Sequence, residues 1–258
     1  MDMTLAEIQR HLRTLRLHGM NATLEPRLIQ ANQGAAFVEV LACLVQDELD
    51  WRRSRITETR FKASGLTERP TLTEFDWGFN PKLPKKEIYE LVTGKFIRDG
   101  GDALLIGSPG TGKSHIAKTV AHAAIQTGYK VVYREAHTFF EDLFEAAQLK
   151  RRKKLIKLFS ETDLLVIDDL FLRKTVPEQA ADDLLDVILN RYSSRKSTMI
   201  TSNRLVDDWG KLLQDNAASS AILDRLLHRG HLLKFEGKSY RLKEASLRLN
   251  ENKPKPSG

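Results

Sequence analysis

Residues 107–114 read Gly-Ser-Pro-Gly-Thr-Gly-Lys-Ser, and they connect an apolar run at 103–106 to a helical stretch that begins at Ser114. The pattern G-x-x-x-x-G-K-[ST] between a strand and a helix indicates a phosphate-binding loop, whose backbone N–H groups turn inward around an anion. The N-terminal dipole of the following helix favours the same negative charge. We therefore expect a nucleoside triphosphate here, with Lys113 on the β and γ oxygens and Ser114 as a ligand of Mg²⁺. The predicted nucleotide contacts are Gly107, Ser108, Pro109, Gly110, Thr111, Gly112, Lys113 and Ser114.

Strand-like and helical patterns alternate from about residue 85 onward. Strands are expected at 102–106, 129–133, 163–167, 197–201 and 231–235. Helices are expected at 85–97, 113–127 and 178–194, with helical segments across 137–159. Repeated βα units of this kind are typical of a three-layer α/β fold, in which a mostly parallel sheet carries helices on both faces.

The region before the βα units is expected to be helical. Residues 4–62 place apolar side chains three and four positions apart, and Gly19 and Gly34 are expected to separate two or three helices. The apolar stripe is either the core of a small bundle or a docking face for a partner. We expect four parts: a helical N-terminal domain that docks a partner or DNA (1–66), a packed linker (67–86), the α/β domain (87–249) and a flexible tail (250–258).

The predicted linker contains three prolines, which exclude a continuous helix. Its aromatic residues Phe75, Trp77 and Phe79 alternate along the chain. They are expected to pack against the α/β domain, and the alternative is that they border an adenine pocket.

The apolar run at 164–167 ends in two carboxylates, Asp168 and Asp169. Lys113 and Asp168 are 55 positions apart, which fits a helix, a strand and a helix between two sheet strands, so both motifs are expected at one edge of the sheet. There Asp168 would hold Mg²⁺ or its water, and Asp169 would orient or deprotonate the attacking water. Asn203 follows the next strand, where it either positions that water or caps a helix.

Two arginines near the C-terminus are candidates for contact with the nucleotide. Arg225, in an Asp-Arg helix, is expected to reach the nucleotide of an adjacent subunit and neutralise charge in the transition state. Arg241 is expected to contact the nucleotide of its own subunit. The chain lacks the Asn-Lys-x-Asp signature of guanine recognition, so ATP is the expected nucleotide.

The net charge of +7 is unevenly distributed, with −1 on residues 1–76 and +8 on residues 77–258. Within 148–157 there are six basic residues and no acid: Lys150, Arg151, Arg152, Lys153, Lys154 and Lys157. Such a cluster favours salt-sensitive, weakly sequence-specific binding of double-stranded DNA, although a solvated helix face is the alternative. Arg173 and Lys174 would extend the track. On this helix Leu149, Leu155 and Ile156 are expected to face the protein.

Several classes of protein are disfavoured by composition. The single cysteine, Cys43, excludes an internal disulfide and a cysteine-based zinc site. The N-terminus lacks the basic start and apolar run of a signal peptide, and no stretch approaches the roughly 18 apolar residues of a membrane span. We expect a cytoplasmic protein without a membrane partner.

Taken together, the phosphate loop, the Asp168-Asp169 strand end, Asn203 and the Asp224-Arg225 helix resemble the IstB-type ATPases of bacterial insertion sequences. The resemblance covers nearly the full length and includes the segment 75–81, Phe-Asp-Trp-Gly-Phe-Asn-Pro. These ATPases belong to the AAA+ group and are close to the DnaC helicase loaders. In the family the first acid of the pair binds magnesium and the arginine finger falls in the Asp-Arg helix.

Two positions depart from this pattern. Asp169 stands where many AAA+ proteins carry Glu, which implies slow turnover, and Phe171 stands where relatives often have Gly.

The resemblance implies an ATPase that forms homo-oligomers on duplex DNA through ATP at subunit interfaces, and that assists DNA transposition by engaging the transposase of its element. One alternative is a DnaC-like loader of a replicative helicase. Another is a phosphate-loop kinase of small molecules, which the basic excess and the separate helical region disfavour.

Overall fold

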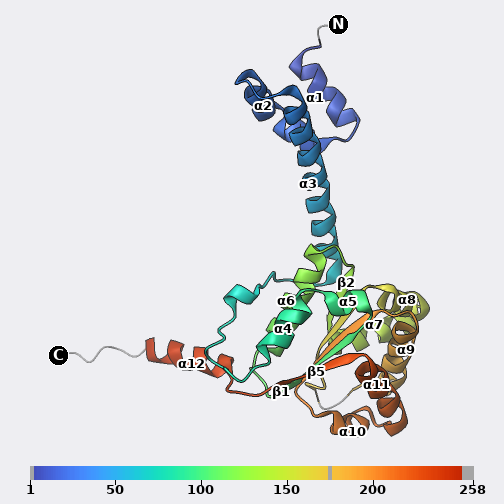
Figure 1. Ribbon diagram of the computed structural model, residues 1–258. Helices are drawn as coiled ribbons and strands as arrows, with labels where there is room; N and C mark the ends of the chain where they lie inside the picture. The colour runs from blue at the N-terminus through green and yellow to red at the C-terminus, as the bar shows by residue number, and fades with distance from the viewer. Residues whose placement is uncertain (1–2, 174–175, 252–258) are drawn as a thin grey trace, which may run out of the picture. The chain divides into compact units, whose positions relative to one another are not determined.

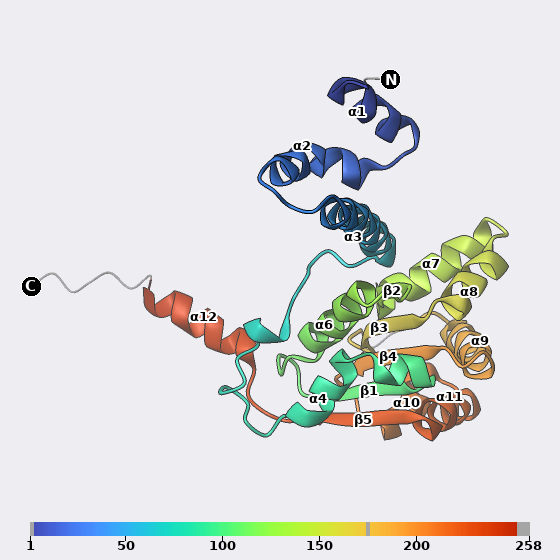
Figure 2. The same ribbon diagram turned by 45° about the horizontal axis from the view of Figure 1, so that its top comes forward.

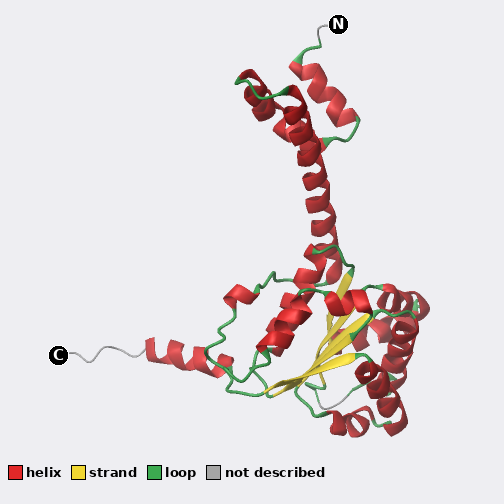
Figure 3. Ribbon diagram, in the orientation of Figure 1, coloured by secondary structure: helices red, strands yellow, loops and turns green. Residues whose placement is uncertain are grey.

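The computed structural model describes residues 3–173 and 176–251, and its contacts divide the chain into two units, Met1–Arg60 and Phe61–Gly258. Figures 1 and 3 show helices alone in the first unit and a sheet with helices in the second. The predicted limits of the four parts stay predictions. Of the predicted tail, residues 252–258 lie outside the described residues, whereas 250 and 251 continue the last helix.

The first unit consists of α1 (Leu5–Thr14), α2 (His18–Asn32) and the N-terminal part of α3 (Phe37–Ser64). Thr4 begins α1 with a reciprocal capping box, in which its hydroxyl accepts the Glu7 N–H and the Glu7 carboxylate accepts the Thr4 N–H. Gly34, at φ +96°, lies between α2 and α3 as expected. The prediction that Gly19 separates helices was wrong, because Gly19 is inside α2.

Close packing explains the glycine at position 19. A Cβ there would lie 2.6 Å from the Asp47 carbonyl oxygen, and the Gly19 N–H donates to the buried Glu48 carboxylate at 2.7 Å. Glycine therefore allows α2 to approach α3 closely, and Glu48 satisfies an N–H group at the start of α2.

The second unit is built on a five-stranded, wholly parallel sheet in the order β2-β3-β4-β1-β5. The strands are β1 (Asp102–Gly107), β2 (Val131–Glu135), β3 (Leu164–Leu170), β4 (Ser197–Ser202) and β5 (Gly230–Phe235). The expected α/β fold with a mostly parallel sheet is confirmed. All five predicted strands are present, with β2 beginning two residues late because the turn at Gly128 and Tyr129 closes the preceding helix.

Helices cover both faces of this sheet (Figure 2). One face packs against α4 (Lys85–Val92), α5 (Lys95–Asp99) and α6 (Lys113–Gln126). The other packs against α7 (Ala136–Gln148), α8 (Arg152–Glu161), α9 (Ala180–Ser193), α10 (Trp209–Leu213) and α11 (Asn216–His228). Side chains alternate between the two cores along each strand, so Leu105 joins the α6 side and Leu104 the α9 side. The last helix is α12 (Tyr240–Glu251).

The predicted helix at 85–97 is divided in two, and the helical segments predicted across 137–159 are two helices. The stretch 85–97 breaks at Gly94, which has φ +70° and separates α4 from α5. The stretch 137–159 breaks at Lys150, which has φ +55° and separates α7 from α8. Left-handed backbone ends an α-helix, so neither stretch is one continuous helix.

The segment between α3 and α4 contains a short 3₁₀ turn, η1 (Leu72–Glu74), and a second, η2 (Val206–Asp208), follows β4. Phe75 and Trp77 pack against the α6-side core, with their ring centroids 4.7 Å apart. The ring of Phe79 packs against the ring of Tyr240, with the two ring centroids 5.3 Å apart. Among the residues that the structure describes, no helix combines the length and the apolar character needed to cross a lipid bilayer.

Candidate nucleotide-binding site

The phosphate loop lies between β1 and α6, and its glycines adopt backbone conformations that other residues rarely take. Gly110 has φ +77° and Gly112 has φ +103°. A Cβ on Gly112 would approach the Phe75 ring to 2.7 Å, so the loop passes close to the segment before α4. Because α6 begins at Lys113, its first N–H groups have no acceptor within the helix. This arrangement suits an anion.

The ammonium group of Lys113 lies folded over the loop. Its Nζ donates to the carbonyl oxygens of Gly107 at 2.7 Å and Ser108 at 2.8 Å, and the residue is only 4% exposed. Burial lowers the pKa of Lys113, and the charges of Asp169 and Asp168 oppose that shift. A buried ammonium is stabilised by an anionic partner, which a triphosphate would supply.

Both acids of the β3 end lie near this loop, as the spacing predicted. Asp168 is buried, at 2% exposure, and Asp169 has φ +56°, which turns its side chain away from the regular path of the strand. Burial raises the pKa of Asp169, and the neighbouring charge of Asp168 raises it further. A carboxylate whose pKa is raised accepts a proton more readily, as a general base requires.

A cavity of about 160 Å³ brings four predicted groups together. The phosphate loop, Asp169, Asn203 and Arg241 all line it. A second cavity of about 290 Å³ shares Gly112 and His115 with the first, and its other walls include Phe75, Phe79 and Asn80. Phe75 and Phe79 of the predicted linker therefore border a cavity beside the phosphate loop, whereas Trp77 packs against the core without lining that cavity.

Two polar atoms of these cavities fit a bound ligand. The Asn203 Oδ1 and His115 Nε2 atoms are buried, and within the described part of the chain neither has a hydrogen-bond partner. The alternative role of Asn203 as a helix cap is not seen, because Leu205 begins η2 without a side-chain cap. Buried polar atoms are stable when they are paired, so a nucleotide or its water is a suitable partner for both.

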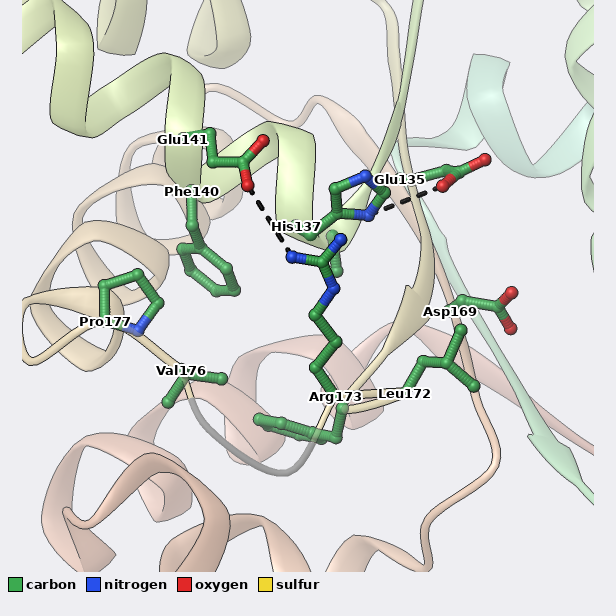
Figure 4. Close-up of a pocket in the computed structure, with 11 residues that line it drawn as sticks. Glu135, His137, Phe140, Glu141, Asp169, Leu172, Arg173, Val176 and Pro177 are labelled. Carbon is green, nitrogen blue, oxygen red and sulfur yellow. Dashed lines mark ion pairs between the residues drawn. The ribbon is translucent and has the colours of Figure 1, made fainter.

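A larger cavity, of about 560 Å³, is also lined by Asp169 (Figure 4). Its apolar wall includes Phe140, Val176 and Pro177, and two ion pairs cross it. The Arg173 Nη1 atom lies 3.7 Å from Glu141 Oε1, and the His137 Nδ1 atom lies 3.4 Å from Glu135 Oε2. The phosphate loop lines the 160 Å³ cavity and does not line this larger one, so the smaller cavity is the candidate nucleotide site.

The sequence reasoning missed two residues that contact Asp168. The Tyr133 hydroxyl donates to Asp168 Oδ2 at 2.5 Å, and the Thr201 hydroxyl donates to Asp168 Oδ1. Both side chains are buried, and they come from the strands on either side of β3. The only signal in the sequence is a polar group near the end of an apolar strand, and the strand order is needed to interpret it.

Arg225 lies on α11, apart from the residues that line the cavities beside the phosphate loop. Its guanidinium pairs with Asp224 at 3.0 Å and donates to the Ala221 carbonyl oxygen at 3.4 Å. Its side chain is 36% exposed, so it is accessible to a second molecule. The predicted contact with an adjacent subunit's nucleotide stays a prediction.

The basic cluster divides into residues with and without an internal role. Arg152 pairs with the buried Asp183 at 2.7 Å and with Asp186 at 2.9 Å, so it stabilises the contact between α8 and α9. Lys157 lies 3.6 Å from Glu161. The residues that remain candidates for DNA contact are Lys150, Arg151, Lys153, Lys154 and Arg173. Lys174 lies outside the described residues.

The apolar side chains of this segment behave differently from one another. Leu155 and Ile156 pack against the core, as expected. The expectation for Leu149 was wrong, because it is 64% exposed. The reason is the break before α8, which places Leu149 in the turn and not on the helix.

The wholly parallel sheet, with a phosphate loop after β1 and an acidic pair at the end of β3, two strands away from β1, defines a P-loop nucleotide-binding protein. The chain belongs to the family of IstB-like ATP binding proteins, whose model matches residues 10–248. It is 34% identical to a protein named as ATP-binding in insertion sequence IS5376 of Geobacillus stearothermophilus, over 85% of this chain and 86% of the relative. It is 31% identical to the corresponding protein of insertion sequence IS21 from Pseudomonas aeruginosa, over 92% and 89%.

Solved structures support the same fold. The crystal structure of the DnaC helicase loader matches with a TM-score of 0.52 and 21% identity, over 69% of this chain and 99% of that one. AMPPCP-bound DnaA from Aquifex aeolicus matches with a TM-score of 0.56 and 24% identity, over 72% of this chain and 56% of that one. At these identities the likeness concerns the fold alone.

Proposed function

We propose that this chain is an AAA+ ATPase that assembles on duplex DNA with ATP and assists transposition by engaging the transposase of its insertion sequence. The observation that carries the proposal is the 160 Å³ cavity, where the phosphate loop meets Asp169, Asn203 and Arg241. Membership in a family of ATP-binding proteins, with relatives named from insertion sequences, supports the nucleotide and the genetic setting.

In this proposal the α6 N-terminus and Lys113 hold the triphosphate, and Ser114 and Asp168 hold the accompanying Mg²⁺. The metal, when bound, neutralises charge on the phosphate oxygens. Asp169 takes the proton from the attacking water, and Asn203 orients that water through its unpaired Oδ1. Arg241, which lines the same cavity, stabilises charge on the phosphates.

The assembly step is proposed to use a second copy of the chain. Arg225 of one protomer would complete the site of the next, so that ATP joins the two and its hydrolysis releases them. The exposed cations of the α7–α8 turn and α8 would then line a continuous path for the DNA backbone. Contacts of this kind release counterions, and binding is therefore expected to weaken steeply with salt.

The test measures the mass of the assembly by light scattering, with a DNA duplex and with ATP or ADP. Wild type with ATP is expected to form a large complex, whereas ADP or the Lys113→Ala variant leaves it small. An assembled mass that is the same with ATP and ADP would refute the proposal that ATP joins the protomers and that its hydrolysis releases them. Co-purification with the transposase of the element, compared with a replicative helicase, tests the partner. Capture of the helicase alone would replace transposition with helicase loading.

A further inference from the structure

The Asp168 carboxylate is held between hydroxyl groups from both neighbouring strands. In the order β2-β3-β4, Tyr133 lies on β2, Asp168 on β3 and Thr201 on β4. Tyr133 donates to Oδ2 at 2.5 Å and Thr201 donates to Oδ1, so each carboxylate oxygen accepts one hydroxyl. We call these three residues the brace.

Strand register explains why the three side chains meet. Tyr133 is paired with Val166, two residues before Asp168, so its side chain lies on the same face of the sheet as Asp168. The long phenol then reaches along the strand to the carboxylate. Thr201 is two residues after Met199, which belongs to the α6-side core, and it therefore shares that face. The brace lies on the side of the sheet that α6 covers, where Lys113 and Ser114 begin the helix.

Thr201 also connects the two acids. Its Oγ1 accepts the N–H of Asp169 at 2.8 Å while its hydroxyl proton is donated to Asp168. Asp169 has φ +56°, a conformation that is unfavourable for aspartate unless neighbouring groups hold it. One hydroxyl group therefore fixes the orientation of the Asp168 carboxylate and the turn that directs Asp169.

The three residues of the brace are buried, so the hydrogen bonds between them are not replaced by bonds to water. Tyr133, Asp168 and Thr201 are 6%, 2% and 0% exposed, so water does not provide alternative partners. A buried carboxylate needs donors to remain charged, and two hydroxyls leave further lone pairs for a metal or its water. Groups that hydrogen-bond to a metal ligand set its orientation, and their loss typically lowers metal affinity about 10–100-fold.

We propose that Tyr133 and Thr201 are positioning residues that orient the Asp168 carboxylate toward the metal that accompanies ATP. The inference rests on the proposed ATP site and assigns to that site two residues that do not touch the nucleotide. Its distinctive consequence is that losing either hydroxyl weakens metal binding while leaving metal-free nucleotide binding unchanged.

The experiment separates these two affinities. ATP affinity is measured by calorimetry with EDTA, and Mn²⁺ affinity by electron paramagnetic resonance with saturating ATP. For Tyr133→Phe and Thr201→Val we expect Mn²⁺ to bind at least about tenfold more weakly, with metal-free ATP affinity changed less than about twofold. Thr201→Ser keeps the hydroxyl and is expected to retain Mn²⁺ affinity. Tyr129→Phe removes a phenol that precedes β2 and serves as the matched control.

Three results would overturn the inference. One is unchanged Mn²⁺ affinity in both hydroxyl variants, and another is an equal loss for Tyr129→Phe. The third is an equal loss of metal-free ATP binding, which would indicate general damage to the site. Melting temperatures identify a variant that fails to fold. Thr201→Ser then remains informative, because we expect this variant to retain its affinity for Mn²⁺. If wild type itself binds no ATP, the proposed function fails, whereas a binding wild type with unaffected variants refutes only the brace.

Discussion

The buried carboxylate of Asp102 provides a quantitative test of the structure through the pH dependence of stability. Asp102 begins β1 and is 6% exposed, and its Oδ1 accepts the Thr198 N–H at 2.6 Å. Burial raises the pKa of Asp102 from 3.8 to about 6, although the Thr198 hydrogen bond and the charge of Arg191 oppose the shift. The perturbation is Asp102→Asn, which keeps an acceptor of the same shape and removes the titration.

The sign follows from proton binding. Because its pKa is higher in the folded state, folded protein holds the Asp102 proton to higher pH than unfolded protein does. The resulting stabilisation is complete below pH 3.8 and is lost as the pH rises through about 6. Integrating between pH 4.5 and 7.5 gives a loss of about 2 kcal/mol in the free energy of unfolding from this group alone.

The assay is urea denaturation of wild type and Asp102→Asn at pH 4.5 and 7.5. For each protein we take the change in the free energy of unfolding between the two pH values, and the change for wild type is then subtracted from the change for the variant. Other carboxylates titrate in both proteins and cancel in the subtraction. We expect the variant to gain about 2 kcal/mol relative to wild type on going from pH 4.5 to 7.5. Parallel pH profiles for the two proteins would show that Asp102 titrates normally, and the argument from burial would then fail.

Three further predictions concern hydrolysis, DNA binding and thermal stability. Asp169→Asn is expected to bind ATP like wild type but to hydrolyse it about 100-fold or more slowly, because the general base is lost; equal loss of ATP affinity, measured by calorimetry, would contradict that role. Lys153→Ala is expected to weaken DNA binding and to reduce the slope of log affinity against log salt by about 1, since one phosphate contact disappears. Arg152→Ala should instead lower the melting temperature, because it leaves the buried Asp183 without its cation, and an unchanged melting temperature would refute this assignment.

The parts of the site that depend on short stretches of chain were predictable from the sequence. The phosphate loop, the β3 strand with its acidic end and the strand that precedes Asn203 each follow from local patterns of glycine, apolar and polar residues. Their meeting at one edge of the sheet also followed, because parallel βα units place the ends of all strands on the same side. The class of protein was determined at this level.

What required the tertiary structure was the pairing of residues far apart in the sequence. Tyr133 and Thr201 contact Asp168 from 35 and 33 positions away, and Arg152 pairs with Asp183 from 31 positions away. No periodic pattern encodes these partners, because they depend on which strands and helices become neighbours and in what register. The same holds for the position of the break before α8, where the left-handed residue Lys150 separates the helical segments expected across 137–159. Local patterns therefore determined the elements and the chemistry of the loop, and packing alone decided which side chains hold the carboxylate in place.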